Sequence, residues 1–71
     1  MRKVINGKTY DTSTARLIAK SKEGELYEKK TGEYFLRVTQ KEISLDIIHP
    51  ITKKQAEKWA DETAEEFAPF G

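Results

Sequence analysis

The sequence contains no cysteine and a single histidine, His49. Disulfides, cysteine nucleophiles and metal sites built from cysteine and histidine clusters are therefore excluded. Enzymes commonly use a nucleophile beside a base, a metal cluster, or paired carboxyl groups inside a cleft. A chain of 71 residues offers little of the first two and little volume for the third. We therefore expect a non-enzymatic protein without catalytic residues, metal or cofactor.

Long apolar runs are also missing. No stretch approaches the roughly 20 apolar residues of a membrane-spanning helix, and Met1-Arg2-Lys3-Val4-Ile5 leads into a turn rather than an apolar signal segment. We expect a cytoplasmic protein that makes no contact with a membrane. The hydrophobic fraction of 37% and the charged fraction of 35% approach those of disordered chains. The periodicity described below nevertheless indicates one folded domain over residues 1–71.

The net charge of +1 hides an uneven distribution of charge along the chain. Residues 1–40 carry nine Lys or Arg and five Asp or Glu, which gives +4, whereas residues 41–71 carry four and seven, which gives −3. The charge of the basic half is compatible with nucleic acid binding on one face. A protein that mimics DNA would usually be far more acidic than this chain. Charge alone does not decide between these classes.

The first 20 residues predict a hairpin and a short helix. Asn6-Gly7 between two short β-prone runs is a strong hairpin signal, because both turn positions need a positive φ. Residues 11–14, Asp-Thr-Ser-Thr, are helix-capping types and precede an apolar segment, so we predict a helix over residues 13–20. Phosphate binding at that helix start would need a glycine-rich loop and a following lysine, which are missing; capping is the better interpretation.

Residues 25–39 predict a second hairpin. Its loop, Lys30-Thr31-Gly32, fits a type I turn with a bulge at the glycine. This loop pairs Leu26 with Leu36 and Tyr27 with Phe35, whereas a two-residue Thr-Gly turn would slip the register and exchange the faces. A third strand is predicted over residues 43–48, ending at His49-Pro50.

A C-terminal helix is predicted to cover the sheet. Thr52 caps it, Gln55 completes a capping box, and Pro69 ends it. Its apolar stripe is Ala56, Trp59, Ala60, Thr63, Ala64 and Phe67. The stripe is expected to cover one face formed by Leu26, Tyr34, Leu36, Val38, Ile43, Leu45 and Ile47. The fold class is therefore α+β: an N-terminal β-hairpin, a short helix, a three-stranded antiparallel meander, and an amphipathic C-terminal helix packed on the sheet.

The opposite sheet face is the first candidate binding surface. It is predicted to present Tyr27, Lys29, Phe35 and Arg37, together with Ser44 and Asp46 from the next strand. Aromatic and basic side chains on a sheet can stack and neutralise single-stranded nucleic acid. Alternatively, the N-terminal hairpin or a second subunit covers Tyr27 and Phe35. Small domains rarely leave such an area uncovered, which favours the alternative.

The charge order of the C-terminal helix gives the second candidate. Lys53 and Lys54 lie in its first turn, and Asp61, Glu62, Glu65 and Glu66 lie toward its end, which is the reverse of what the helix macrodipole favours. The acidic end could contact a basic groove on a partner. The alternative is a solvated face balanced by pairs such as Lys58 with Glu62. His49 is interpreted as a turn or interface residue rather than a catalytic one.

Three segments resemble small proteins carried by phages and mobile elements of Gram-positive bacteria. They are residues 5–12 with Thr14-Ala15 and Ile18-Ala19, residues 25–36, and Pro50-Ile51-Thr52 with Ala56, Trp59 and Ala60. This chain is shorter than typical members between the predicted first helix and the second hairpin, and again after that hairpin. The resemblance implies an anti-CRISPR or other anti-defence inhibitor that occupies a surface on a larger host complex.

We therefore expect a small binding protein that inhibits a host defence complex such as CRISPR–Cas by surface occlusion. Its partner would be a host protein or nucleoprotein complex. The alternative is a small regulatory protein that binds nucleic acid through the basic and aromatic sheet face. A homodimer joined through the same face is a further possibility.

Overall fold

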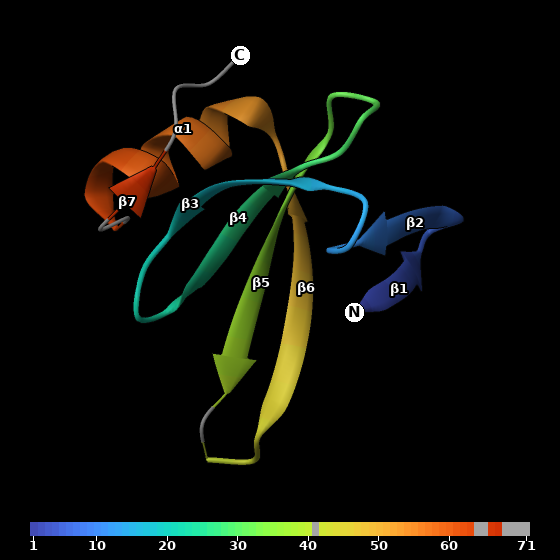
Figure 1. Cartoon of the computed structure of the whole chain (residues 1–71), viewed down its shortest axis with the longest axis horizontal. Helices are drawn as coiled ribbons and strands as arrows, with labels where there is room; N and C mark the ends of the chain where they lie inside the picture. The colour runs from blue at the N-terminus through green and yellow to red at the C-terminus, as the bar shows by residue number, and fades with distance from the viewer. Residues whose placement is uncertain (41, 64–65, 68–71) are drawn as a thin grey trace.

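The computed structural model describes residues 1–40, 42–63 and 66–67, with side chains described up to residue 63. Strands β1 (Arg2–Ile5) and β2 (Lys8–Asp11) form a separate hairpin. A second, antiparallel sheet has the order β6-β5-β4-β3-β7 (Figure 1). Its elements are β3 (Arg16–Lys20), β4 (Gly24–Glu28), β5 (Tyr34–Gln40), β6 (Leu45–Ile51) and the short β7 (Glu66–Phe67), and helix α1 (Lys53–Glu62) follows β6. The α+β class is confirmed, with a four-stranded meander in place of the predicted three strands.

The predicted helix over residues 13–20 is wrong, because this segment contains strand β3. The Asp11 carboxylate accepts hydrogen bonds from the Ser13 N–H at 2.9 Å and the Ser13 hydroxyl at 2.7 Å, so the helix-capping residues close a turn instead. The pairing of β3 with β4 shifts between Leu17 and Ala19. Such a bulge interrupts the alternation of a strand, and Ile18 and Ala19 both enter the same core.

Both predicted hairpins are confirmed, and their turn residues have the expected backbone conformations. Asn6 and Gly7 have φ values of 51° and 75°. In the second hairpin Gly32 has a φ of 91°, and its N–H donates to the Lys29 carbonyl at 2.9 Å. The predicted pairs Leu26–Leu36 and Tyr27–Phe35 are both confirmed.

The third predicted strand is displaced. Strand β6 begins at Leu45, two residues later than expected, and continues through His49 and Pro50 to Ile51. Among the described residues it pairs only with β5, so it is an edge strand. An edge strand can contain a proline, because no strand on its outer side needs the missing N–H. Ile43 lies in the preceding turn, and Ser44 there has a φ of 51°. Ser44 is therefore not part of a strand face, contrary to our prediction.

The predicted start of the C-terminal helix is confirmed. The Gln55 N–H donates to the Thr52 hydroxyl at 3.1 Å, and the Thr52 N–H donates to the Gln55 side chain at 2.9 Å. The predicted extension to Phe67 is wrong, because α1 ends at Glu62 and residues 66–67 pair with Ala19 and Lys20 of β3. Ala64, Pro69 and the Phe67 side chain lie outside the described residues.

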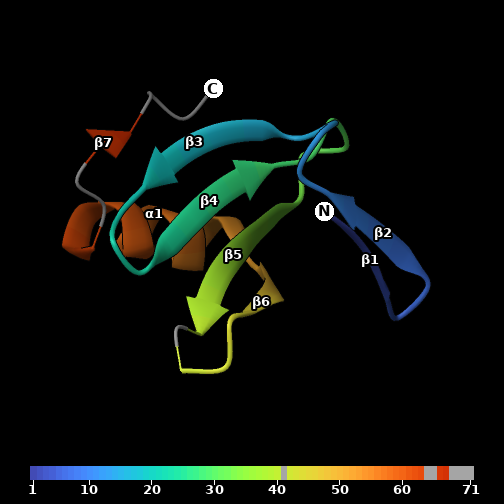
Figure 2. The same ribbon diagram turned by 60° about the horizontal axis from the view of Figure 1, so that its bottom comes forward.

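The sheet has a small core on each face. Figure 2 shows helix α1 and the N-terminal hairpin on opposite sides of strands β4 and β5. On the helix side, Ala56 and Ala60 of α1 are buried against Ile18, Ala19, Leu26 and Tyr34, with Trp59 half-buried at the margin. On the other side, Tyr10 of the N-terminal hairpin is buried with Tyr27, Phe35 and Ile48. Helix α1 and the hairpin therefore cover opposite faces of the sheet. Ile43 and Leu45, which we expected under the helix, are 62% and 49% exposed.

Candidate functional site

The predicted open sheet face is covered where its aromatic residues lie. Tyr27 is 8% exposed and Phe35 is 0% exposed. The Tyr10 ring contacts Phe35 edge-on, with centroids 5.4 Å apart, and Tyr27 stacks on Phe35 at 5.2 Å. Cover by the N-terminal hairpin, the alternative interpretation, is confirmed. Tyr27 and Phe35 are not available to stack on bases or to join two subunits face to face.

Lys29 helps to hold this cover in place. Its ammonium group lies 4.5 Å from the centre of the Tyr10 ring and 3.3 Å from the Glu33 carboxylate. Glu33 also accepts a hydrogen bond from Lys8 of β2 at 2.8 Å. These contacts connect the N-terminal hairpin to the β4–β5 loop. The positive charge of Lys29, predicted to meet a partner, is thus paired inside the domain.

Arg37 is likewise engaged within the fold. Its guanidinium donates to Glu25 at 2.8 Å and to Asp46 at 2.9 Å. Asp46 accepts a further bond from the Thr39 hydroxyl at 2.7 Å, and Glu25 accepts one from the Tyr27 hydroxyl at 3.0 Å. Hydrogen bonds from Thr39 and Arg37 lower the pKa of Asp46, and those to Asp46 and Glu25 raise the pKa of Arg37. This network joins three neighbouring strands and leaves Arg37 without a free charge for a partner.

The attachment of the N-terminal hairpin is expected to weaken in acid. Hydrogen bonds from Lys8, Thr31 and Lys29 lower the pKa of Glu33 from 4.5 to about 2. A carboxyl group whose pKa is lower in the folded than in the unfolded state stabilises the fold at pH values above its unfolded pKa. This contribution is lost as the pH falls through the folded pKa. We expect Glu33→Gln to lower the urea midpoint at pH 7, with the difference from wild type vanishing toward pH 2. Glu23→Gln, at the exposed β3–β4 turn, is the control; a difference that persists unchanged in acid would contradict this role of Glu33.

The acidic end of α1 is exposed, which both interpretations of it, a binding surface and a solvated face, predict. Asp61 and Glu62 are both exposed, and the last turn contains no basic residue. The predicted ion pair between Lys58 and Glu62 is not formed among the residues that the structure describes. Glu65 and the side chain of Glu66 lie outside the described residues. Asp61 and Glu62 are therefore not paired with a cation in the part of the chain that the structure describes.

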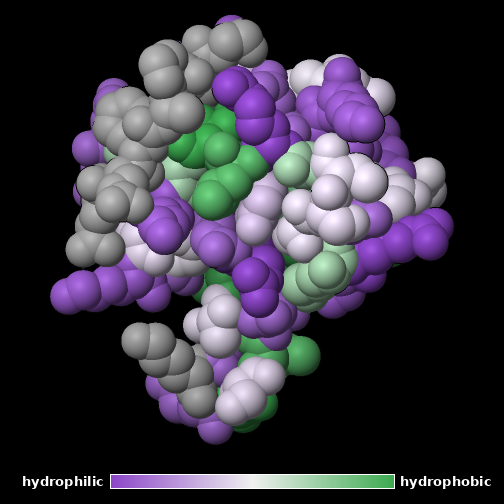
Figure 3. Space-filling model, in the orientation of Figure 1, coloured by the Kyte–Doolittle hydropathy of each residue, from purple (hydrophilic) through white to green (hydrophobic). Residues whose placement is uncertain are grey.

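The apolar surface of the β5–β6 hairpin was not predicted from the sequence. Figure 3 shows hydrophobic side chains at the lower end of the molecule, where this hairpin projects from the body. The exposed residues there are Ile43 and Leu45. Their apolar character was visible in the sequence, but their position on a hairpin that projects from the body of the molecule was not.

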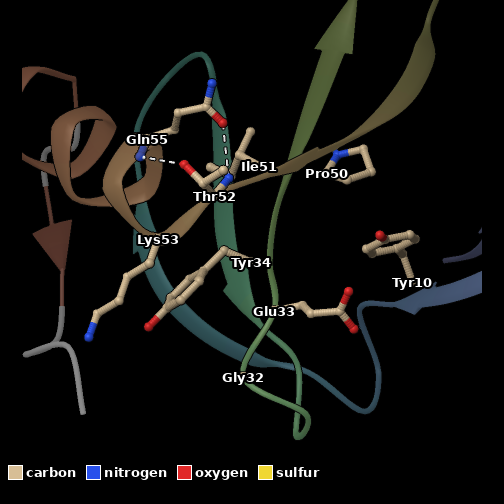
Figure 4. A pocket seen from close by; sticks show the side chains of 9 residues that line it. All are labelled: Tyr10, Gly32, Glu33, Tyr34, Pro50, Ile51, Thr52, Lys53 and Gln55. Carbon is tan, nitrogen blue, oxygen red and sulfur yellow. Dashed lines mark hydrogen bonds between the residues drawn. The ribbon is translucent and has the colours of Figure 1, made fainter.

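Two pockets that are open to solvent lie against the β4–β5 loop. The first, of about 400 Å³, lies between the β4–β5 loop and the start of α1 (Figure 4). It is lined by Tyr10, Gly32, Glu33, Tyr34, Pro50, Ile51, Thr52, Lys53 and Gln55. Thr52 and Gln55 are engaged in the capping box, and Glu33 bonds to Lys8 and Lys29. Asp46 and His49 are an odd number of residues apart on β6, so their side chains lie on opposite faces of the sheet.

Two further observations concern the described residues. They include no helix with the length and apolar character needed to span a membrane. They also contain no group of three or more His, Cys, Asp or Glu side chains placed to hold a metal ion. Comparisons of the chain with protein-family models, curated proteins and solved structures found no match.

Proposed function

We propose that this chain is a small non-enzymatic protein-binding domain that contacts its partner through the exposed end of α1. The observation that carries the proposal is the pair Asp61 and Glu62, which are exposed and form no ion pair with any described cation. Each negative charge at a helix C-terminus is disfavoured by the macrodipole by a few tenths of a kcal/mol. A local rule broken in this way without internal compensation is typical of a functional surface.

A neighbouring aromatic residue supports the same surface. Trp59 is only partly buried, and it lies three residues before Glu62, so the two side chains share one side of the helix. Tryptophan is enriched among the residues that dominate protein interfaces. The patch fits a partner with a basic rim around an apolar pocket.

The class of partner is proposed from the sequence resemblance to phage and mobile-element proteins. On that basis the target is a host defence complex such as CRISPR–Cas, in the cytoplasm of the bacterial host. The mechanism is surface occlusion, which requires shape and charge rather than chemistry. A domain with both sheet faces packed provides a firm body for this role.

Capture from host lysate tests the proposal. The immobilised protein is expected to retain a partner, identified by mass spectrometry. The double variant Asp61→Asn/Glu62→Gln is expected to bind that partner with an affinity at least about tenfold lower, which corresponds to about 1.4 kcal/mol. Glu23→Gln/Glu57→Gln removes two charges from other exposed sites and should retain the partner.

Two outcomes would contradict the proposal. One is equal capture by the two double variants. The other is a shift of DNA or RNA by the purified protein that weakens steeply with salt, because phosphate contacts cause such a dependence. That result would favour the alternative function, direct nucleic-acid binding, through a surface other than Tyr27 and Phe35.

A further inference from the structure

One edge of the five-stranded sheet is open. Strand β6 pairs with β5 on one side, and no strand in the described part of the chain pairs with its other side. The opposite edge is extended by β7, which pairs with β3. An open edge presents unpaired N–H and C=O groups on which another strand can form.

The hydrogen-bond alternation identifies the outward-facing groups of β6. The Lys29 N–H bonds to the Glu33 carbonyl at 2.7 Å, which makes this pair the first hydrogen-bonded pair of the β4–β5 ladder. Antiparallel ladders alternate, so the odd-numbered residues of β5 bond β4 and the even-numbered ones bond β6. Through the observed register, the odd-numbered residues of β6 bond β5. The backbone groups that face outward are therefore those of Asp46, Ile48 and Pro50, and Pro50 has no N–H to leave unpaired.

Apart from Pro50 near its end, this edge lacks the features that usually prevent strands from pairing. Natural edge strands often carry lysine or other charges that repel a neighbour. Residues 45–51 contain no lysine or arginine, and their one carboxylate, Asp46, is tied to Arg37 within the chain. Leu45 and Ile47 lie on the helix-side face, and Leu45 is 49% exposed. Backbone groups and apolar side chains are thus both available along β6.

We infer that β6 pairs antiparallel with β6 of a second copy, around a two-fold axis at Ile47. In this register Asp46 of each copy exchanges N–H···O=C bonds with Ile48 of the other, which pairs every outward N–H of the strand. Ile47 faces Ile47 of the second copy, and Leu45 faces His49. Shifting the axis to Ile48 would place Asp46 opposite Pro50, and the Asp46 carbonyl would then find no donor.

Charge complementarity at the two ends favours a second copy over an unrelated strand. Antiparallel pairing brings the turn before β6, with exposed Glu42, toward the start of α1 in the other copy. That first turn contains Lys53 and Lys54 and no acidic residue, an order that the macrodipole disfavours. A carboxylate from the second copy would offset this unfavourable charge. Lys41, which precedes Glu42, lies outside the described residues.

Sedimentation and disulfide cross-linking of the purified chain test the inference. The wild type is expected to sediment at twice its mass of 8.2 kDa in the micromolar range. Leu45→Lys should give a folded monomer, whereas Val4→Lys, at a site 61% exposed on the N-terminal hairpin, should remain dimeric.

Cross-linking locates the axis, and the absence of native cysteine makes it specific. Ile47→Cys should form a disulfide dimer on mild oxidation, because non-hydrogen-bonded partners have Cα atoms about 4.5 Å apart, within disulfide reach. Leu45→Cys should not, because its two copies would lie about 13 Å apart along the strands. Mixing Leu45→Cys with His49→Cys should restore a cross-linked heterodimer.

A monomeric wild type would overturn the inference, as would a dimer in which Leu45→Cys cross-links as readily as Ile47→Cys. The proposed function is independent of this result. It is measured by capture of a host partner through Asp61 and Glu62, which belong to α1 and take no part in the β6 register. Failure of one experiment therefore leaves the other to be judged on its own result.

Discussion

Phe35→Ala is expected to lower the free energy of unfolding by about 3–5 kcal/mol, as for other buried phenylalanines. The Phe35 side chain is fully buried, between Tyr27 on one side and Tyr10 of the N-terminal hairpin on the other. Its loss removes the central ring of the second core and leaves a cavity under the hairpin. Because small domains are stable by only about 5–15 kcal/mol, much of the folded population would be lost. Urea denaturation followed by circular dichroism measures the change.

Phe35→Leu is the matched control for this variant. Leucine retains most of the apolar volume, so the loss of stability should be clearly smaller than that for alanine. Wild-type stability in Phe35→Ala would mean that the ring lies in solvent. The aromatic sheet face would then be free to bind, which is the interpretation that the sequence favoured less.

Leu26→Ala is expected to cost about 2–5 kcal/mol, because it opens a cavity in the core on the helix side. Leu26 is 0% exposed and lies in one cluster with Tyr34, Ala56 and Ala60. The two alanines of α1 bring the helix backbone close to the sheet, so little side-chain volume is available to fill the space. Thermal and urea unfolding should both show the loss.

Leu17→Ala is the matched control, because it truncates an exposed leucine in the same way that Leu26→Ala truncates a buried one. Leu17 is 44% exposed on β3, so its truncation should cost much less than that of Leu26. Equal losses at the two positions would contradict the packing of α1 on this face of the sheet.

Local chemistry explains which parts of the fold could be predicted. Asn6-Gly7 and Gly32 occupy positions that need a positive φ, and this requirement fixed both hairpins and the Tyr27–Phe35 register. Thr52 and Gln55 form a capping box that is defined within four residues. In each case the decisive interaction joins residues that are close in sequence.

The errors arose where distant partners decide. Ile18 and Ala19 are adjacent and both buried, because a β-bulge interrupts the pairing of β3 with β4. In the sequence, two adjacent apolar residues resemble part of a helical stripe. The end of α1 was misplaced because residues 66–67 pair with β3, far away in the chain. Tertiary pairing replaced the local preference in both segments.

The candidate site was affected in the same way. Period-2 alternation correctly placed Tyr27, Phe35 and Arg37 on one face, but alternation does not show what lies on that face. The N-terminal hairpin buries Tyr27 and Phe35, and Glu25 and Asp46 pair with Arg37. The acidic end of α1 needed no distant partner to be exposed, and Asp61 and Glu62 remain accessible.

The exclusion of Tyr27 and Phe35 as a binding surface depends on the N-terminal hairpin, which covers this face of the sheet. Nuclear Overhauser contacts between ring protons measure this directly. The protein is predicted to show strong contacts between Tyr10 and Phe35, whose ring centres are 5.4 Å apart. Absence of these contacts, together with a Phe35 ring broadened by a soluble paramagnetic agent, would contradict it.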